Sequence, residues 1–67
     1  MKKNIKASNS LAEKRTDKKM TQEELANKVN VSIQTIQSIE KGKYKPSISL
    51  AFAIASLLDE KVDSVFP

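Results

Sequence analysis

Three hydroxyl residues, each placed directly before an apolar-periodic segment, restrict this chain to a set of short helices. Thr21, Ser32 and Ser47 can each accept a hydrogen bond from a free amide in the first helical turn, as helix N-caps do. Glu24 follows Thr21 at the spacing of a reciprocal capping box. With one glycine and two prolines, the chain also lacks the residues for the many tight turns of an all-β protein. We therefore expect an all-α fold.

The caps and the stop signals predict five helical segments. The first covers residues 10–18 and has a weak apolar pattern. The capped helices are expected from Gln22 to just before Asn30, over residues 33–40, and over residues 48–58, with a last turn or short helix at residues 62–66. Asn30 and Gly42 suit the left-handed backbone conformation that ends a helix.

The composition excludes several classes of protein. Sixty-seven residues allow one domain of modest stability, and without cysteine there is no disulfide to reinforce it. The chain also lacks histidine and any nucleophile in a strained turn, so we expect neither a metal site nor an enzyme. No cofactor and no small-molecule ligand is indicated.

No segment has the pattern of a membrane span or a signal peptide. The longest apolar run, residues 50–58, is far shorter than the roughly 20 residues that cross a bilayer. The basic start at Met1 is followed by polar residues instead of the apolar region of a signal peptide. We therefore expect a cytoplasmic protein that does not bind membranes.

Positive charge is concentrated in the first two thirds of the chain. The net charge is +4: residues 1–45 hold eleven Lys and Arg against five Asp and Glu, whereas residues 46–67 hold one Lys against three acidic residues. A basic front and an apolar, slightly acidic rear indicate polyanion contact at one end and packing at the other. Residues 1–9 are predicted to be a basic, flexible arm, with contact to DNA as the alternative, and residues 10–67 the folded domain.

The helix predicted over residues 33–40 has two unlike faces. Ile36 and Ile39 lie on the stripe that we expect to be buried. The side left toward solvent is expected to carry an isoleucine beside two glutamines and a serine: Ile33, Gln34, Gln37 and Ser38. A basic loop follows, with three lysines around a tyrosine: Lys41, Lys43, Lys45 and Tyr44. Two short helices joined by a tight turn, the second exposing glutamines before a basic loop, form a helix-turn-helix suited to binding double-stranded DNA.

The side chains of this face favour A·T base pairs. The amide of glutamine offers a donor and an acceptor together, which matches N6 and N7 of adenine. The methyl groups of Ile33 can pack on the methyl group of thymine. Lysines act differently, because each phosphate that they neutralise releases counterions without selecting a sequence.

Several of these residues have a simpler structural alternative. Thr21 and Ser32 are caps first, and any phosphate contact is additional. The lysines of the loop can equally be solvated charges. Tyr44 can cover the edge of the core instead of reaching a phosphate.

The segment after Pro46 is apolar around most of its circumference. At 100° per residue, the apolar side chains of residues 48–58 cover an arc of about 260°. Either they complete the core of one chain or they form a two-fold interface, so that residues 48–67 dimerise. The candidate interface residues are Leu50, Phe52, Leu57, Val65 and Phe66. A second hypothesis is a protein-interaction module, such as an antitoxin or antirepressor, that uses this segment to bind another protein.

The chain resembles the phage repressor and Cro type of helix-turn-helix transcriptional regulator, also called Xre-like. The resemblance covers residues 10–66 and is carried by residues 21–26, 31–32, 34–36, 39–44 and 46–47. The short single-domain bacterial forms are particularly similar, since they end soon after a segment like residues 62–66. Lys19 and Asn30 stand where many relatives have glycine, and Ile33 stands where an arginine or glutamine often begins the reading surface.

The resemblance implies a compact five-helix bundle of the lambda-repressor-like type, with the helix-turn-helix formed by the second and third helices. Such regulators usually bind palindromic operators as homodimers and repress, or sometimes activate, nearby genes. The positions implied to face base edges are Ile33, Gln34, Gln37 and Ser38. Those expected to contact phosphates are Gln22, Thr21, Ser32, Lys41, Lys43 and Lys45. The resemblance also implies a structural ion pair between Arg15 and Glu40. With no sensor domain in the chain, a regulatory protein partner is one possible source of control.

Overall fold

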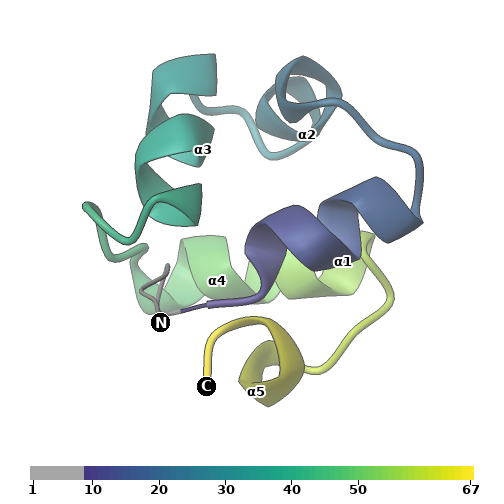
Figure 1. Ribbon diagram of the computed structural model, residues 1–67. Coiled ribbons are helices and arrows are strands. Elements are labelled where there is room, and N and C mark those ends of the chain that lie inside the picture. The colour runs from purple at the N-terminus through teal and green to yellow at the C-terminus, as the bar shows by residue number, and fades with distance from the viewer. Residues whose placement is uncertain (1–8) are drawn as a thin grey trace, which may run out of the picture.

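Five α-helices and no strand make up the part of the chain that the computed structural model describes, residues 9–67. They are α1 (Leu11–Asp17), α2 (Gln22–Lys28), α3 (Ile33–Glu40), α4 (Ile48–Leu57) and α5 (Val62–Val65) (Figure 1). This confirms the predicted all-α, five-helix architecture. Residues 1–8, which hold nearly all of the predicted basic arm, lie outside the described residues, so the arm stays a prediction.

Three of the helices begin at the predicted hydroxyl caps. The oxygen Oγ1 of Thr21 accepts from the Glu24 amide at 3.0 Å, and Glu24 Oε1 accepts from the Thr21 amide at 2.8 Å, which completes the capping box. Ser32 caps α3 through the Thr35 amide at 3.1 Å. Ser47 caps α4 in the same way, also at 3.1 Å. Local sequence therefore determines where these helices start.

α1 is capped differently from the others. Ser10 makes no side-chain cap, and the cap is instead Asn9, whose Oδ1 accepts from the Leu11 amide at 3.0 Å. The same side chain donates through Nδ2 to the carbonyl of Ile39 at 2.8 Å. One asparagine thus both starts α1 and joins it to α3.

Left-handed residues end four of the elements. Gly42 has φ 77° after α3, as predicted for a C-terminal cap. Lys19, Asn30 and Asp59 adopt φ 58°, 62° and 57° although each carries a Cβ atom. Only asparagine and aspartate among these can relieve the conformation with a short polar side chain, so Lys19 is the most strained.

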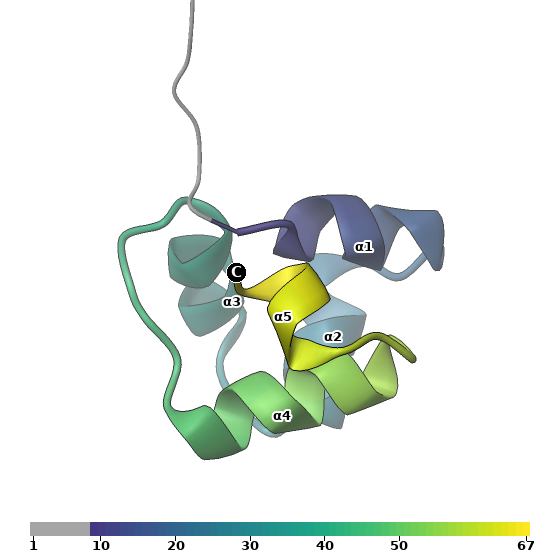
Figure 2. The same cartoon turned by 90° about the horizontal axis from the view of Figure 1, so that it is seen from below.

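The core lies where all five helices meet. Its fully buried large side chains come from every element: Leu11, Leu25, Ile36, Ile39, Ile54, Leu58 and Val65. α2 and α3 pack together on one side, and α5 lies against both α1 and α4 on the other (Figures 1 and 2). The Ser10 amide donates to the carbonyl of Val65 at 2.8 Å, which ties the start of the fold to its last helix.

Only one side of α4 faces the core. Ala51, Ile54 and Ala55 are buried, whereas Ile48 is 78% exposed and Phe52 is 59% exposed. The predicted dimer-interface residues divide accordingly. Phe52 is exposed and Leu50, Leu57 and Phe66 are half-buried, but Val65 is fully buried in its own chain. Including Val65 in an interface was wrong, because its side chain has no surface left for a second copy.

Within residues 9–67, every helix is too short or too polar to cross a membrane.

Candidate nucleic-acid interface

α2 and α3 form a compact helix-turn-helix. α2 ends at Lys28 with Val29 as its C-cap, and Asn30 reverses the chain so that the amide of Val31 donates to the carbonyl of Ala26 at 3.0 Å. Ser32 then starts α3 almost at once. Leu25 and Ile36 are fully buried and hold the two helices to the core. The turn leaves the outer side of α3 uncovered within the described part of the chain (Figure 1).

The outer side of α3 carries the four residues that were expected to face bases. Ile33 is 39% exposed and Gln34 is also exposed, whereas Gln37 and Ser38 are half-buried. The structure thus brings all four to one side, with the first turn of α3 most accessible. An apolar methyl surface, an amide and a hydroxyl are groups that can read base edges in the major groove.

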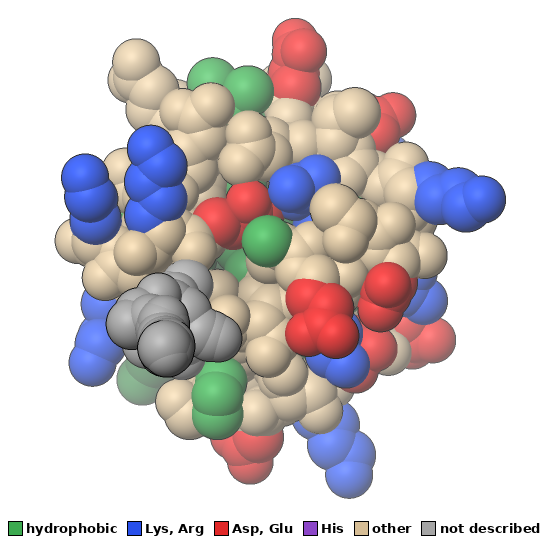
Figure 3. Space-filling model, viewed as in Figure 1, with side chains coloured by type: hydrophobic (Ala, Val, Ile, Leu, Met, Phe, Trp, Pro, Cys, Tyr) green, Lys and Arg blue, Asp and Glu red, His purple; other side chains and the backbone are tan. Residues whose placement is uncertain are grey.

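The loop after α3 supplies positive charge beside this face. Lys41, Lys43 and Lys45 are exposed. In Figure 3, Lys and Arg side chains lie over the loop between α3 and α4 at the left of the view, and others lie among acidic side chains at the right and lower right. The loop is held to α3 because the amides of Lys43 and Tyr44 donate to the Ser38 carbonyl at 2.9 and 3.3 Å. The backbone of the loop is therefore held next to α3.

The remaining predicted phosphate contacts lie at the starts of the two helices. Thr21 and Ser32 are exposed, and each already uses its oxygen as a cap. Ser32 Oγ also lies 2.9 Å from Thr35 Oγ1, with either atom able to donate. Gln22, the first residue of α2, is half-buried.

An ion pair joins α1 to the end of α3 behind this surface. Nε of Arg15 lies 2.6 Å from Glu40 Oε2, and its Nη2 donates to Glu40 Oε1 at 3.3 Å. The two side chains are 12% and 8% exposed. Nη1 of Arg15 also donates to the carbonyl of Met20 at 2.7 Å, so one guanidinium fixes both α3 and the α1–α2 turn. This is the pair that the family resemblance implies.

Two glutamines extend the ion pair to the outer side of α3. Gln22 Nε2 donates to Glu40 Oε1 at 2.8 Å, and Gln37 Nε2 donates to Gln22 Oε1 at 3.4 Å. Sequence analysis assigned Gln22 to phosphate and Gln37 to bases but missed the bonds between them. The missing signal is three-dimensional, since the two residues lie on different helices.

Sequence analysis also missed a shallow hollow beside α3. Its volume is about 220 Å³, and it is lined by Ser32, Gln34, Thr35, Ser38 and Tyr44. Tyr44 is 50% exposed and borders this hollow, beside the candidate base-reading residues. Thr35, which was not a candidate, lines the hollow beside Gln34, and its Oγ1 lies 2.9 Å from Oγ of Ser32.

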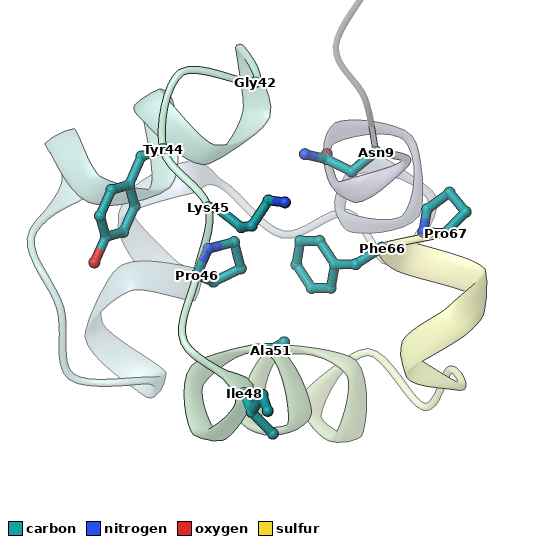
Figure 4. Close-up of a pocket in the computed structure, with 9 residues that line it drawn as sticks. All are labelled: Asn9, Gly42, Tyr44, Lys45, Pro46, Ile48, Ala51, Phe66 and Pro67. Carbon is teal, nitrogen blue, oxygen red and sulfur yellow. The ribbon is translucent and has the colours of Figure 1, made fainter.

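A second hollow lies between the loop after α3, the start of α4 and the end of the chain. It has a volume of about 250 Å³, and Figure 4 shows Lys45 and Phe66 pointing across it toward each other. Pro46, Ile48 and Ala51 form its apolar side. Among residues 9–67, no cluster of three or more Asp, Glu, His or Cys side chains is placed to hold a metal ion.

Comparison with known proteins identifies similar chains over most of this length. The family model described as helix-turn-helix matches residues 11–65. An uncharacterized HTH-type transcriptional regulator of Methanocaldococcus jannaschii is 55% identical over 47 residues, which cover 70% of this chain and 71% of that protein. Another, from Methanothermobacter thermautotrophicus, is 46% identical over 57 residues, covering 84% of this chain and 83% of that protein. The immunity repressor protein of Bacillus phage phi105 is 37% identical over 51 residues, covering 76% of this chain but 35% of the repressor.

Proposed function

The chain belongs to the helix-turn-helix family, and from this premise we propose that it is a sequence-specific DNA-binding transcriptional regulator. In this proposal α3 enters the major groove with Ile33, Gln34, Gln37 and Ser38 toward the base edges. The observation that carries it is the joint exposure of the first turn of α3 and of the lysines directly after it. The names of the similar proteins, HTH-type transcriptional regulators and a phage immunity repressor, support the same activity.

In this proposal, different residues recognise the bases and contact the DNA phosphates. Gln34 and Gln37 offer amides that can pair with adenine, and Ile33 offers methyl groups for thymine. Lys41, Lys43 and Lys45 neutralise phosphates, with Gln22, Thr21 and Ser32 as uncharged donors at the helix starts. With α3 in the groove, the lysines can reach the DNA phosphates beside it, because the loop that carries them is bonded to α3 through the carbonyl of Ser38.

The regulator acts as a homodimer on a palindromic operator and represses transcription. The exposed side of α4 supports dimerisation, since Ile48 and Phe52 lie four residues apart on one helical face and bury little of their surface in their own chain. Leu50, Leu57 and Phe66 are half-buried and can complete the interface at its margins. Two copies related by a two-fold axis would read half-sites about one helical turn, roughly 34 Å, apart.

The test is the selection of DNA fragments from a random pool by the purified protein, followed by sequencing. We expect one enriched motif with two inverted half-sites, rich in A·T pairs where α3 reads. Binding to that motif should weaken steeply with salt, because phosphate contacts release counterions. A pool without enrichment, or binding that does not depend on salt, would contradict the proposal.

The exposed apolar residues of α4 also support a second candidate, a module such as an antitoxin or antirepressor that binds a different protein. Ile48 and Phe52 would then contact that partner instead of a second copy. Sedimentation velocity of the pure protein separates the two candidates. A discrete dimer favours the regulator, whereas a monomer or an aggregating species favours the interaction module.

A further inference from the structure

Gln22 lies between the buried ion pair and a residue that faces the groove. Its Nε2 is 2.8 Å from Oε1 of Glu40, and its Oε1 is 3.4 Å from Nε2 of Gln37. The bonds therefore run from α3 to α2 and back to α3. A phosphate contact alone does not require this arrangement, because an amide on the surface can turn freely to meet a phosphate.

The chemistry of the ion pair fixes which way each amide points. The guanidinium of Arg15 only donates hydrogen bonds, and the carboxylate of Glu40 only accepts them. Gln22 must therefore turn its NH₂ group toward Glu40, which leaves its Oε1 toward Gln37. An oxygen in that place requires the NH₂ group of Gln37. The orientation of a buried charge pair is thus transmitted to an amide at the surface.

The fixed amide of Gln37 has a defined polarity toward DNA. With one N–H engaged by Gln22, Gln37 keeps its Oε1 as an acceptor and its second N–H as a donor. Adenine offers the matching N6 donor and N7 acceptor, and cytosine offers its N4 donor. Guanine and thymine instead place the acceptors O6 and O4 opposite Oε1 of Gln37, which is also an acceptor. A hydrogen bond at that place requires the amide to turn over and lose its bond to Gln22.

We propose that Gln22 is a positioning residue for base recognition, which holds the amide of Gln37 so that it accepts from an exocyclic amino group of adenine or cytosine and rejects the keto bases. This inference rests on the proposed DNA-binding function and concerns the specificity of that same site. The second N–H of Gln22 remains able to donate to a phosphate. Gln22 thus contributes to sequence choice without touching a base.

The test compares three proteins in the same fragment selection: the wild type, Gln37→Ala and Gln22→Met. Gln37→Ala identifies the operator position that Gln37 reads, because preference is lost there alone. We expect the wild type to select adenine or cytosine at this position over guanine or thymine by about tenfold, the size of one good amide–base contact. Methionine at position 22 keeps the length of the side chain but cannot orient Gln37, so the preference there should fall to about twofold or less. Preferences at other positions should stay.

Two controls separate positioning from a general effect. Gln34→Met removes an exposed amide on α3 and should alter a different operator position. Gln22→Asn keeps an amide that is too short to bridge Glu40 and Gln37, and it should behave like Gln22→Met. Thermal unfolding followed by circular dichroism tests whether each variant is folded. If Gln22→Met is unfolded, Gln22→Asn takes its place in the comparison.

The possible failures are distinguishable. If the wild type enriches no motif, the proposed function is wrong and this inference falls with it. If a motif appears but guanine or thymine occupies the position that Gln37 reads, only the inference is wrong. The same holds if both variants at position 22 weaken every sequence equally, since that is the behaviour of a phosphate contact alone.

Discussion

At the scale of single residues, the outer side of α3 and the loop behind it differ in what a substitution should change. Gln34→Ala and Gln37→Ala should each relax base preference at one position in each half-site and cost about 1–3 kcal/mol per half-site. Lys43→Ala should weaken all sequences alike and lower the slope of log affinity against log salt by about one for each copy, or about two for the dimer. Fluorescence anisotropy titrations at several salt concentrations measure both. Equal effects from glutamine and lysine variants would refute the division of roles.

Lys19 offers a prediction about stability. Its φ of 58° is unfavourable for a residue with a Cβ atom, and glycine adopts this conformation without strain. Lys19→Gly should therefore raise the free energy of unfolding by up to about 1 kcal/mol, after the greater entropy of the unfolded glycine chain is subtracted. Urea denaturation measures the change. Asn30→Gly is the matched control and should gain less, because asparagine already tolerates φ 62°. An unchanged or lower stability for Lys19→Gly would contradict the strain argument.

The residue pattern alone predicted hydrogen bonds whose partners are close along the chain and missed those whose partners are distant. Thr21, Ser32 and Ser47 cap helices through amides three residues away, so the sequence alone was sufficient. Asn9 could not be predicted, because its second partner is the carbonyl of Ile39, 30 residues away. The bond between Gln22 and Gln37 could not be predicted for the same reason, because the two residues lie on different helices.

At the scale of helices, breaking the buried ion pair between α1 and α3 should be strongly destabilising. Arg15→Met leaves the 8%-exposed carboxylate of Glu40 without its charged partner, which should lower the free energy of unfolding by about 3 kcal/mol. A double variant, Arg15→Met with Glu40→Met, removes both charges and should recover a large part of the loss. Urea denaturation of the three proteins gives the comparison. A double variant as unstable as the single one would show that the uncompensated charge is not the cause.

α4 shows why the presence of a helix is easier to predict than its orientation. The apolar residues of α4 surround most of the helix, so the pattern predicted a helix without indicating which side faces the core. That choice is made by contacts with α5 and the rest of the core, which bury Ile54 and Val65 and leave Phe52 outside. The error over Val65 came from the same ambiguity, since a short terminal turn can equally close the core or lie open.

At the scale of the whole molecule, the proposed dimer predicts that charge on the exposed side of α4 separates the two copies. Phe52→Lys should shift the protein to a monomer in sedimentation velocity and lower affinity for the two-half-site motif by about tenfold or more, while affinity for a single half-site stays the same. Circular dichroism should be unchanged, because Phe52 is 59% exposed. Thr16→Lys, which adds the same charge at an exposed site on α1, is the control. A Phe52→Lys protein that remains dimeric would place the interface elsewhere.

The bond from the amide of Ser10 to the carbonyl of Val65 also has a consequence for protein synthesis. α1 leaves the ribosome first, yet the partners that hold its start, the carbonyls of Ile39 and Val65, are made later. An isolated helix of α1's length is unstable in water. The start of α1 therefore cannot complete its native hydrogen bonds until α5 has been synthesised.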